Sequence, residues 1–344
     1  MEPEFKVIIV GGSIAGLTLA HCLDHLGVDY VVLEKRKEIA PQEGASVVLM
    51  PHAGRILEQL GLIDEIGKFI EPLHTAHVSY PDGFKHTDRS PQVLFERFGI
   101  PLAFLERRRL LQSLYSSLRD QSRVLVDRTV VSVQQNEGDI SVVRVEDGSI
   151  YRGDLVVGAD GVHSRVRREM WRLAEFHQPV GITHQEKNGM KIDYVCVFGI
   201  SNAVPNLRPG EQVTGFQDGR SLLVFPGQNG RVYWFLFKKL DRQYEYRSAP
   251  QWSKGGTTKI AEEFARDDVW AGLQFQHIWM TREVVGITNL EENVFSTWHS
   301  GRMVCIGDSM HKFAPNTGQG ANIAIEDAAI STLLPYATVN LTFF

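Results

Sequence analysis

A glycine-rich turn near the N-terminus constrains the fold of this chain most strongly. The apolar run 6–10 predicts a buried strand, and the turn Gly11-Gly12-Ser13-Ile14-Ala15-Gly16 follows it directly. Apolar side chains then recur at helical spacing until Gly27, which is placed to end a helix. A second predicted strand, 29–33, ends at Glu34. This order of elements, within about thirty residues, is the βαβ unit with which a dinucleotide-binding domain begins, so we expect an α/β fold.

The residues of this turn suit a pyrophosphate. Gly11 lets the strand turn sharply into the helix, and Gly16 lets helix and strand pack closely. Ser13 replaces the usual middle glycine, but it still permits close backbone approach and adds a hydroxyl donor. Glu34 stands where an acid accepts hydrogen bonds from a ribose diol. The alternative is a tight turn in an unrelated α/β protein, and neither interpretation distinguishes one dinucleotide from another.

Two later segments also end a predicted strand in an acid followed by glycine. Residues 155–160 form a buried run that ends at Asp160, which taken alone is also a plain helix cap. The strand predicted at 303–306 leads to Asp308 and to a glycine-rich loop, and a helix is expected over 321–334. Asp308 suits a ribityl hydroxyl. The free N–H groups of the loop suit a flavin edge that becomes negative on reduction.

The remaining sequence predicts β structure. Residues 130–157 alternate short β-type runs with turn signals, which indicates an antiparallel meander. Residues 175–285 carry turn dipeptides between aromatic-rich runs, of which 232–237 is the clearest. We expect a separate, largely β layer there.

Composition excludes several classes of protein. The 344 residues carry 43% hydrophobic side chains and a net charge of -5, and no basic run is longer than the three residues 107–109, so nucleic acid is not an expected partner. The three cysteines follow no metal or redox spacing, and we expect no metal site. The start of the chain lacks a secretory pattern, and no apolar run is long enough to span a membrane. We therefore expect an intracellular protein, cytoplasmic or on the cytoplasmic face of an internal membrane, with peripheral membrane contact left open.

With its three motifs in this order, the sequence resembles the FAD-dependent aromatic hydroxylase-like monooxygenases over nearly the whole chain. The segments 10–20, 55–62 and 230–235 are similar to those of fungal enzymes that epoxidise or hydroxylate prenylated secondary metabolites, such as meroterpenoids and indole diterpenes. The resemblance implies a Rossmann-like FAD-binding domain and a mainly β substrate domain. FAD and NADPH are the implied cofactors, and the implied partner is a lipophilic small molecule.

Carried over position by position, the resemblance assigns Glu34 to the FAD ribose, Asp160 to the FAD and NADPH side, and Arg107 to an FAD contact. Val48 falls in a loop where relatives touch the cofactor, usually through a smaller residue. The residues expected to bind cofactor are Gly11, Ser13, Gly16, Glu34, Val48, Arg107, Asp160, Asp308, Gly318, Gly320 and Ala321.

In such enzymes hydride reduces the flavin, oxygen adds to form a flavin hydroperoxide, and a dry pocket protects it until substrate attacks. An alkene needs little acid–base help, whereas a phenol benefits from a base. Tyr194 is the named candidate for a catalytic contact, with a buried structural tyrosine as the alternative. His311 is expected to orient its turn rather than transfer protons. The aromatic residues of the middle region suit either a polyprenyl chain or ordinary sheet core.

We predict a discontinuous FAD-binding domain over 1–75, 103–175 and 285–344, and a substrate domain over 76–102 and 176–284. The first functional hypothesis is epoxidation of a prenylated or terpenoid intermediate, and the second is hydroxylation of a phenol by the same oxygenated flavin. The third is a truncated flavin-binding protein without oxygenase activity, because relatives of this type continue well beyond the last predicted helix. The oligomeric state is left open.

Overall fold

The computed structural model describes residues 5–135, 141–177 and 182–332, and the elements given below are those of these ranges. A sheet of six strands carries the N-terminal motif. Its order is β20-β21-β12-β1-β2-β8, and all neighbours are parallel except β20 and β21. The strands are β20 (His299–Ser300), β21 (Met303–Cys305), β12 (Leu155–Gly158), β1 (Lys6–Val10), β2 (Asp29–Leu33) and β8 (Val124–Leu125).

This parallel sheet is buried on both faces, as parallel sheets generally are. Val7 and Ile9 of β1 pack into one core cluster, whereas Ile8 and Val10 pack into another, because successive side chains point to opposite faces. The first cluster includes the helices α1 (Ile14–Leu26), α5 (Arg107–Ser116) and α10 (Gln319–Ser331). The second includes α6 (Arg165–His177) and the antiparallel meander β9 (Val130–Gln135), β10 (Ser141–Val145) and β11 (Ile150–Gly153).

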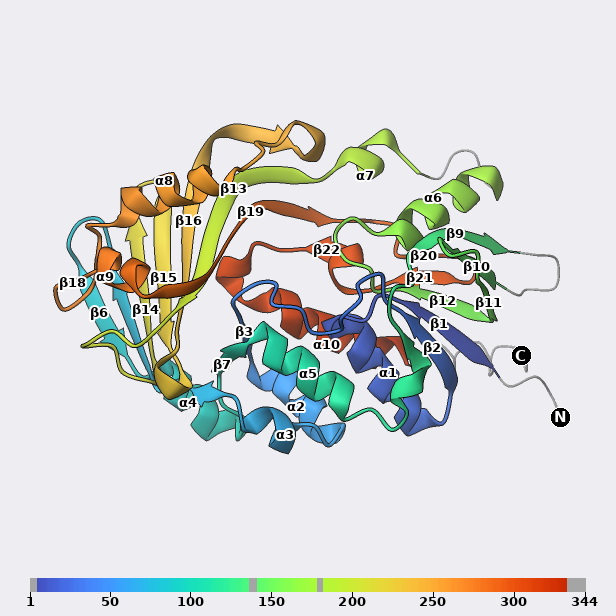
Figure 1. Cartoon of the computed structure of the whole chain (residues 1–344), viewed down its shortest axis with the longest axis horizontal. Helices are drawn as coiled ribbons and strands as arrows, with labels where there is room; N and C mark the ends of the chain where they lie inside the picture. Colours follow the sequence, from blue (N-terminus) through green and yellow to red (C-terminus); the bar gives the residue numbers. More distant parts are fainter. Residues whose placement is uncertain (1–4, 136–140, 178–181, 333–344) are drawn as a thin grey trace.

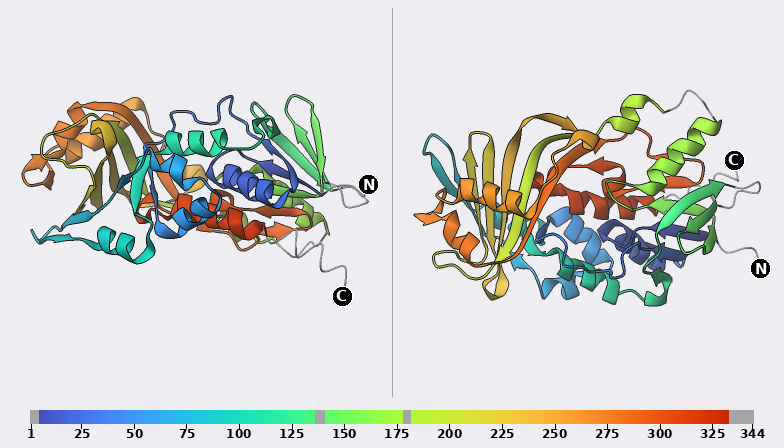
Figure 2. Two further views of the ribbon diagram at one scale, coloured as in Figure 1. Left: turned by 90° about the horizontal axis from the view of Figure 1, so that it is seen from below. Right: turned by 45° about the horizontal axis from the view of Figure 1, so that its top comes forward.

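A second, eight-stranded sheet stands beside this α/β part (Figures 1 and 2). Its order is β22-β19-β13-β16-β15-β14-β5-β6. The strands are β22 (His311–Lys312), β19 (Arg282–Val294), β13 (Lys191–Ser201), β16 (Val232–Glu245), β15 (Arg220–Pro226), β14 (Glu211–Gln217), β5 (Thr75–Ser79) and β6 (Lys85–Asp88). Helices α8 (Lys254–Phe264) and α9 (Phe275–Met280) cover its outer face, and the inner face looks toward the α/β part.

Smaller elements complete the fold. A three-stranded sheet, in the order β3-β7-β4, lies between the two larger parts, and a two-stranded one, β17-β18, lies at the far end (Figure 1). These strands are β3 (Ser46–Leu49), β7 (Ala103–Glu106), β4 (Glu71–Pro72), β17 (Asp268–Trp270) and β18 (Leu273–Gln274). The remaining α-helices are α2 (Pro51–Gln59), α3 (Ile63–Gly67), α4 (Ser90–Phe98) and α7 (His184–Asn188).

The α/β fold with a sheet-rich second part is confirmed, and so are several individual elements. β1, β2 and the meander lie where the sequence predicts them, and Gly27 ends α1 in the left-handed conformation. The α8 and α9 helices were not predicted within 175–285, because strand and turn signals dominate that region. The exact division of the chain into two domains at the predicted boundaries stays a prediction. None of the helices in the described ranges is long and apolar enough to cross a membrane.

The packing of the first turn leads to a stability prediction. A Cβ on Gly16 would lie 1.9 Å from the carbonyl oxygen of Gly11, an atom that cannot move without breaking the turn. We expect Gly16→Ala to lower the free energy of unfolding by about 2–4 kcal/mol, the range of severe overpacking. Gly67→Ala is the matched control, because nothing lies within 4 Å of a Cβ there. Urea denaturation of both variants measures the difference, and equal stabilities would contradict this account.

Candidate functional site

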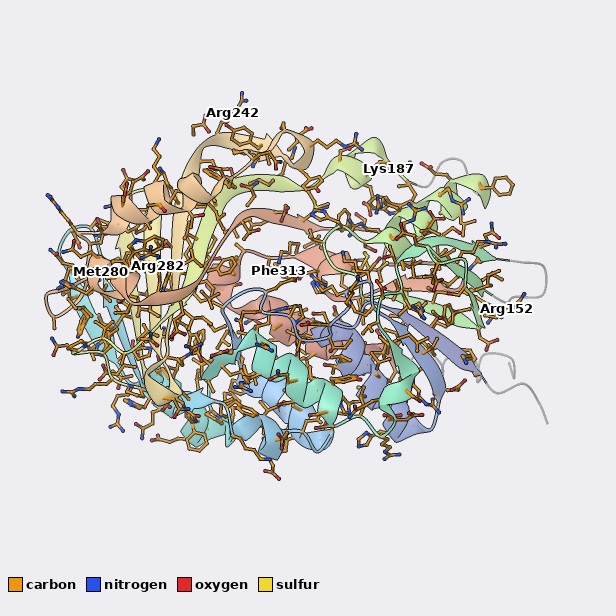
Figure 3. All side chains as sticks on the ribbon, in the orientation of Figure 1. Arg152, Lys187, Arg242, Met280, Arg282 and Phe313 are labelled. Atoms are coloured by element: carbon orange, nitrogen blue, oxygen red, sulfur yellow. The ribbon has the colours of Figure 1, made fainter. Side chains whose placement is uncertain are left out.

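A cavity of about 1220 Å³ lies between the α/β part and the inner face of the eight-stranded sheet. The ends of the parallel strands and the loops that follow them form one wall, and sheet side chains form the other. Phe313, which lines the cavity, lies in the space between the two parts in Figure 3. All predicted cofactor-binding residues except Gly16 line this cavity, and Gly16 packs behind the turn.

The first wall segment is the turn after β1. Gly11 has a φ of 109°, and a Cβ there would lie 2.3 Å from the carbonyl oxygen of Ala159. This position therefore requires glycine. The backbone N–H of Gly12 donates to Glu34 Oε2 at 2.6 Å. The turn after β1 and the end of β2 are thereby tied together at the cavity.

Glu34 is nearly inaccessible, with 4% of its surface exposed. Its other carboxylate oxygen, Oε1, accepts a hydrogen bond from the backbone N–H of Arg36 at 2.9 Å. Oε1 also lies 3.5 Å from the Arg36 guanidinium. A carboxylate has about four acceptor positions, so Glu34 keeps capacity for a ligand hydroxyl in addition to these contacts.

Charged side chains connect the first turn to α5. Arg107 donates to the Ser13 hydroxyl at 2.8 Å, and Arg36 forms a salt bridge with Glu43 at 2.6 Å. Burial, and next to it the positive charge of Arg36, lower the pKa of Arg107. The Ser13 hydroxyl, which replaces the middle glycine of the motif, thus holds Arg107 at the cavity wall. The sequence pattern did not indicate this contact between the two side chains.

Asp160 has one of the two roles that the sequence left open, the helix cap, and its cofactor contact stays a prediction. Its Oδ2 accepts from the N–H groups of Arg165 and Val166, at 2.6 and 3.1 Å, and so caps α6. Its Oδ1 is buried without a partner in the protein, and burial raises the pKa of this carboxyl. Because a buried acceptor without a partner is costly, this atom at the cavity wall fits a hydroxyl donor from a bound cofactor.

A third wall segment follows β21, next to the segments that follow β1 and β12. Asp308 lines the cavity and forms a salt bridge with Lys312 at 2.9 Å. Gly318 has a φ of 66°, and a Cβ there would lie 2.5 Å from Cγ1 of Val48. Val48 therefore packs directly on the glycine loop that precedes α10, and both line the cavity.

Two residues of α10 that the sequence analysis missed hold this wall together. The fully buried Asn322 accepts from the N–H of Met50 at 2.9 Å, and it donates to the carbonyls of Val48 at 3.0 Å and Gly318 at 2.7 Å. It therefore joins the glycine loop to the end of β3. The signal in the sequence for this role of Asn322 was an amide side chain among small and apolar residues of the helix.

Asp327, five residues further along α10, holds the loop on both sides of Asp308. Its Oδ2 accepts from the N–H of Gly307 at 2.7 Å and lies 2.6 Å from His311 Nε2. Burial lowers the pKa of His311, but the hydrogen bond and charge of Asp327 outweigh it, and the net pKa is raised. This geometry gives His311 an orienting role in the loop.

The opposite wall is the inner face of the eight-stranded sheet. Its register places Val78, Thr214, Leu223, Phe235 and Phe198 side by side across five adjacent strands, and all of them line the cavity. The Phe198 ring lies over Gly286 of the next strand, where a Cβ would be 2.4 Å from Cζ of that ring. The absence of a side chain there makes room for an aromatic ring.

Tyr194 lies beside this wall rather than in it. It packs against a small cluster with Cys196, Phe237 and Leu290, and it is not among the residues that line the cavity. Its role as a catalytic contact stays a prediction.

The residues of the polar wall fit FAD on observations of this structure. A close-packed glycine turn, a buried carboxylate oxygen without a partner and a glycine loop at a helix start adjoin one cavity of about 1220 Å³. The backbone N–H groups at the start of α10 are the donors expected for a flavin edge. Fold and site together define an FAD-binding oxidoreductase.

Known proteins are similar to this chain in sequence. The family described as FAD binding domain matches residues 4–332. The FAD-dependent monooxygenase cle3 of Aspergillus versicolor is 67% identical over 327 residues, which are 95% of this chain and 67% of that protein. The FAD-dependent monooxygenase spyC of Aspergillus fumigatus is 62% identical over 328 residues, 95% of this chain and 69% of that protein. This chain thus spans about two thirds of the length of these relatives.

Solved structures have the same fold. HpxO of Klebsiella pneumoniae, complexed with FAD and uric acid, gives a TM-score of 0.72 at 23% identity over 95% of this chain and 78% of that chain. The 2,6-dihydroxypyridine-3-hydroxylase of Arthrobacter nicotinovorans gives 0.71 at 19% identity over 95% and 82%. The chain belongs to the FAD-binding domain family and is an FAD-dependent monooxygenase.

The Asn322 contacts generate a prediction about stability. Asn322→Leu leaves the N–H of Met50 and the carbonyl of Val48 buried without partners. Each unsatisfied group costs about 1–3 kcal/mol, so we expect a loss of roughly 2–4 kcal/mol in the free energy of unfolding. The control is Asn316→Leu, because Asn316 is exposed in the same loop. Urea titration in the presence of FAD measures both, and a loss no greater than that of the control would refute the assigned role.

The His311–Asp327 pair generates a prediction about pH. A raised pKa in the folded state means that the pair stabilises the protein fully below the ordinary histidine value of 6.5. This contribution is lost as pH rises through the raised folded pKa. We expect wild type to exceed His311→Gln in stability by about 1.5–3 kcal/mol at pH 5.5, the usual worth of a charged hydrogen bond, and by less at pH 9. Thermal or urea unfolding across this range tests it, and a pH-independent difference would count against a charged His311.

Proposed function

We propose that this monooxygenase uses NADPH and oxygen to epoxidise a prenylated or terpenoid intermediate. The observation that carries the proposal is the unequal chemistry of the two cavity walls. One wall holds charged and glycine-rich loops, and the other is an aromatic and aliphatic sheet face. A cofactor suits the first wall and a lipophilic chain suits the second, within one continuous space.

The sheet face favours an alkene as the reacting group. Its central row contains only apolar side chains and Thr214. The other polar residues that line the cavity from this sheet are uncharged, except Glu291 of β19 and Lys312 of β22; they are Tyr80, Cys196, Gln212, Ser221, Thr288 and Asn289. The Cys196 thiol is fully buried, and burial raises its pKa far above neutrality. No group in this row is therefore suited to take a proton at neutral pH. Epoxidation needs none, because FAD, when bound and reduced by NADPH, would deliver one atom of O2 in an electrophilic form.

The apolar wall also serves to exclude water. Phe104 of β7 stacks on Phe225 of the sheet with ring centroids 3.7 Å apart, and Arg231, just before β16, forms a salt bridge with Glu106 at 3.1 Å. These contacts join the β3-β7-β4 sheet to the eight-stranded sheet beside the cavity. A dry environment there protects reactive oxygen from wasteful loss.

Hydroxylation of a phenol is the second candidate, because one partly buried carboxyl lines the cavity from the eight-stranded sheet. Glu291 of β19 has a pKa that burial raises, and it lies near Lys312 and Asp308. A carboxylate within reach of a phenol would make the ring more electron-rich. Glu291 lies beside the charged loops rather than in the sheet row, so we place this function second. Tyr194 remains proposed as a polar contact next to the wall.

The proposed reaction is tested with FAD-loaded protein, NADPH, ¹⁸O₂ and 4-farnesylphenol as the probe. We expect substrate to accelerate NADPH oxidation at least about tenfold, a change of 1.4 kcal/mol in barrier, and one ¹⁸O atom to appear in an epoxide by mass spectrometry. Leu223→Asp should uncouple NADPH oxidation from oxygenation, because a charge enters the dry wall. Val285→Asp, at an exposed position of β19, is the control. Label in the aromatic ring would favour the second candidate, and no label in product would reject both.

A further inference from the structure

Three aromatic side chains lie in contact at the edge of the eight-stranded sheet that ends in β5 and β6 (Figure 1). The ring centroid of Tyr80, which follows β5, lies 5.5 Å from that of Phe216 on β14 and 5.9 Å from that of Phe84, just before β6. Tyr80, Phe84 and Phe216 are 43%, 57% and 40% exposed, and they are called the rim cluster below. Adjacent exposed aromatic residues of this kind mark a binding surface.

The rim cluster is continuous with the apolar wall of the main cavity. Tyr80 and Phe216 line that cavity, whereas Phe84 does not, so the cluster runs from the cavity to the outer surface. Phe216 lies two residues beyond Thr214, and Tyr80 lies two residues beyond Val78. Side chains two residues apart on a strand share a face, so the two rings extend the row of the wall by one position.

The opposite end of this row adjoins the cofactor wall. Val48, which packs on the glycine loop before α10, shares a hydrophobic cluster with Phe198 and Phe235. From β13, which carries Phe198, four steps between neighbouring strands lead through β16, β15 and β14 to β5. At about 4.8 Å for each step, the row is about 19 Å long. A substrate whose reacting group lies near the glycine loop therefore needs an extended chain to reach the rim cluster.

The distribution of charge favours this direction for the remainder of the substrate. On the other side of Phe198, β19 and β22 present Glu291 and Lys312 to the cavity. The strands β5, β14 and β15 lie wholly within the described residues, and none of them contributes a charged side chain to the cavity. A hydrocarbon chain laid against charged groups would displace their water at a cost in free energy. An apolar chain is therefore expected to extend toward β14 and β5.

We propose that the rim cluster binds the end of the substrate remote from the reacting alkene, and that it thereby selects for a chain of several isoprene units. Each bond advances an extended carbon chain by roughly 1.3 Å, so a farnesyl chain reaches about 15 Å and a single prenyl unit about 5 Å. With its phenol ring, 4-farnesylphenol spans the row, whereas 4-prenylphenol does not. The bound end covers aromatic surface that otherwise contacts water. This inference rests on the proposed oxidation of a prenylated substrate and assigns residues to its chain-length selectivity.

Titration of the oxidised, FAD-loaded protein tests the rim cluster without turnover. The probes are 4-farnesylphenol and 4-prenylphenol, and calorimetry together with the absorbance change of bound FAD gives their dissociation constants. The variants are Phe216→Ala, Tyr80→Ala and Tyr80→Phe. Phe95→Ala is the matched control, because Phe95 on α4 is 47% exposed and is not among the residues that line the cavity.

We expect Phe216→Ala and Tyr80→Ala each to weaken binding of 4-farnesylphenol about tenfold, which corresponds to 1.4 kcal/mol of lost apolar contact. Tyr80→Phe keeps the ring and should bind this probe as the wild type does. The short probe, 4-prenylphenol, should perturb the FAD absorbance and bind all variants equally, which also reports an intact cavity. Phe95→Ala should change the affinity for neither probe.

Unchanged affinity for 4-farnesylphenol in Phe216→Ala and Tyr80→Ala would overturn the inference, as would an equal loss of affinity for both probes. The inference would also be overturned if these variants bound both probes normally but lost binding to phosphatidylcholine vesicles or lost self-association, since the rim cluster would then face a lipid surface or a second copy. If 4-farnesylphenol binding depends on the rim cluster but no oxygenated product forms, the proposed function fails while the chain-length site stands. If the epoxide forms and binding does not depend on the rim cluster, the inference alone fails.

Discussion

The close approach of α1 to the turn that precedes it is the constraint on which the site depends. Gly16 sits against the carbonyl of Gly11, and Gly11 sits against Ala159, so neither position has room for a side chain. This packing brings the end of β1 against the end of β12. Because β1, β12 and β21 are parallel neighbours, the loops that follow them emerge at one edge of the sheet. Three motifs that are far apart in the chain become one cavity wall for this reason.

The last described helix, α10, secures that wall with polar contacts placed in a core. Asn322 and Asp327 satisfy backbone groups of loops from different parts of the chain, and His311 completes the second of these contacts. Apolar packing alone would not determine the conformation of loops that carry glycines at positive φ, such as Gly307 and Gly318. Buried hydrogen bonds are directional, so they select one loop conformation where dispersion forces would permit several.

Most of the charged side chains and the apolar side chains lie on opposite sides of the cavity. Glu34, Arg107, Asp160 and Asp308 lie on the α/β side, and the sheet face opposite presents aromatic and aliphatic side chains. Such a division lets an ionic cofactor and a lipophilic substrate meet without either losing a matching environment. Burial of charged groups in this cavity shifts their protonation equilibria, and it raises the pKa of Asp160 and Glu291. Both groups line the cavity, and Oδ1 of Asp160 has no partner in the protein.

The sequence by itself determined the βαβ start, the meander, the α/β class, and the glycines and acids that line the cavity. These features depend on local rules such as periodicity, glycine turns and strand ends. It did not indicate α8 and α9, where strand and turn signals masked the helices, nor the clamping roles of Asn322 and Asp327. Whether Tyr194 faced the cavity was equally undetermined, and it lies beside the wall. The sequence also did not indicate that Arg167, Lys187 and Arg247, which come from three separate elements, line one small cavity. Only the tertiary structure decided these points, since long-range packing determines which side chains meet, and no short stretch of sequence encodes it.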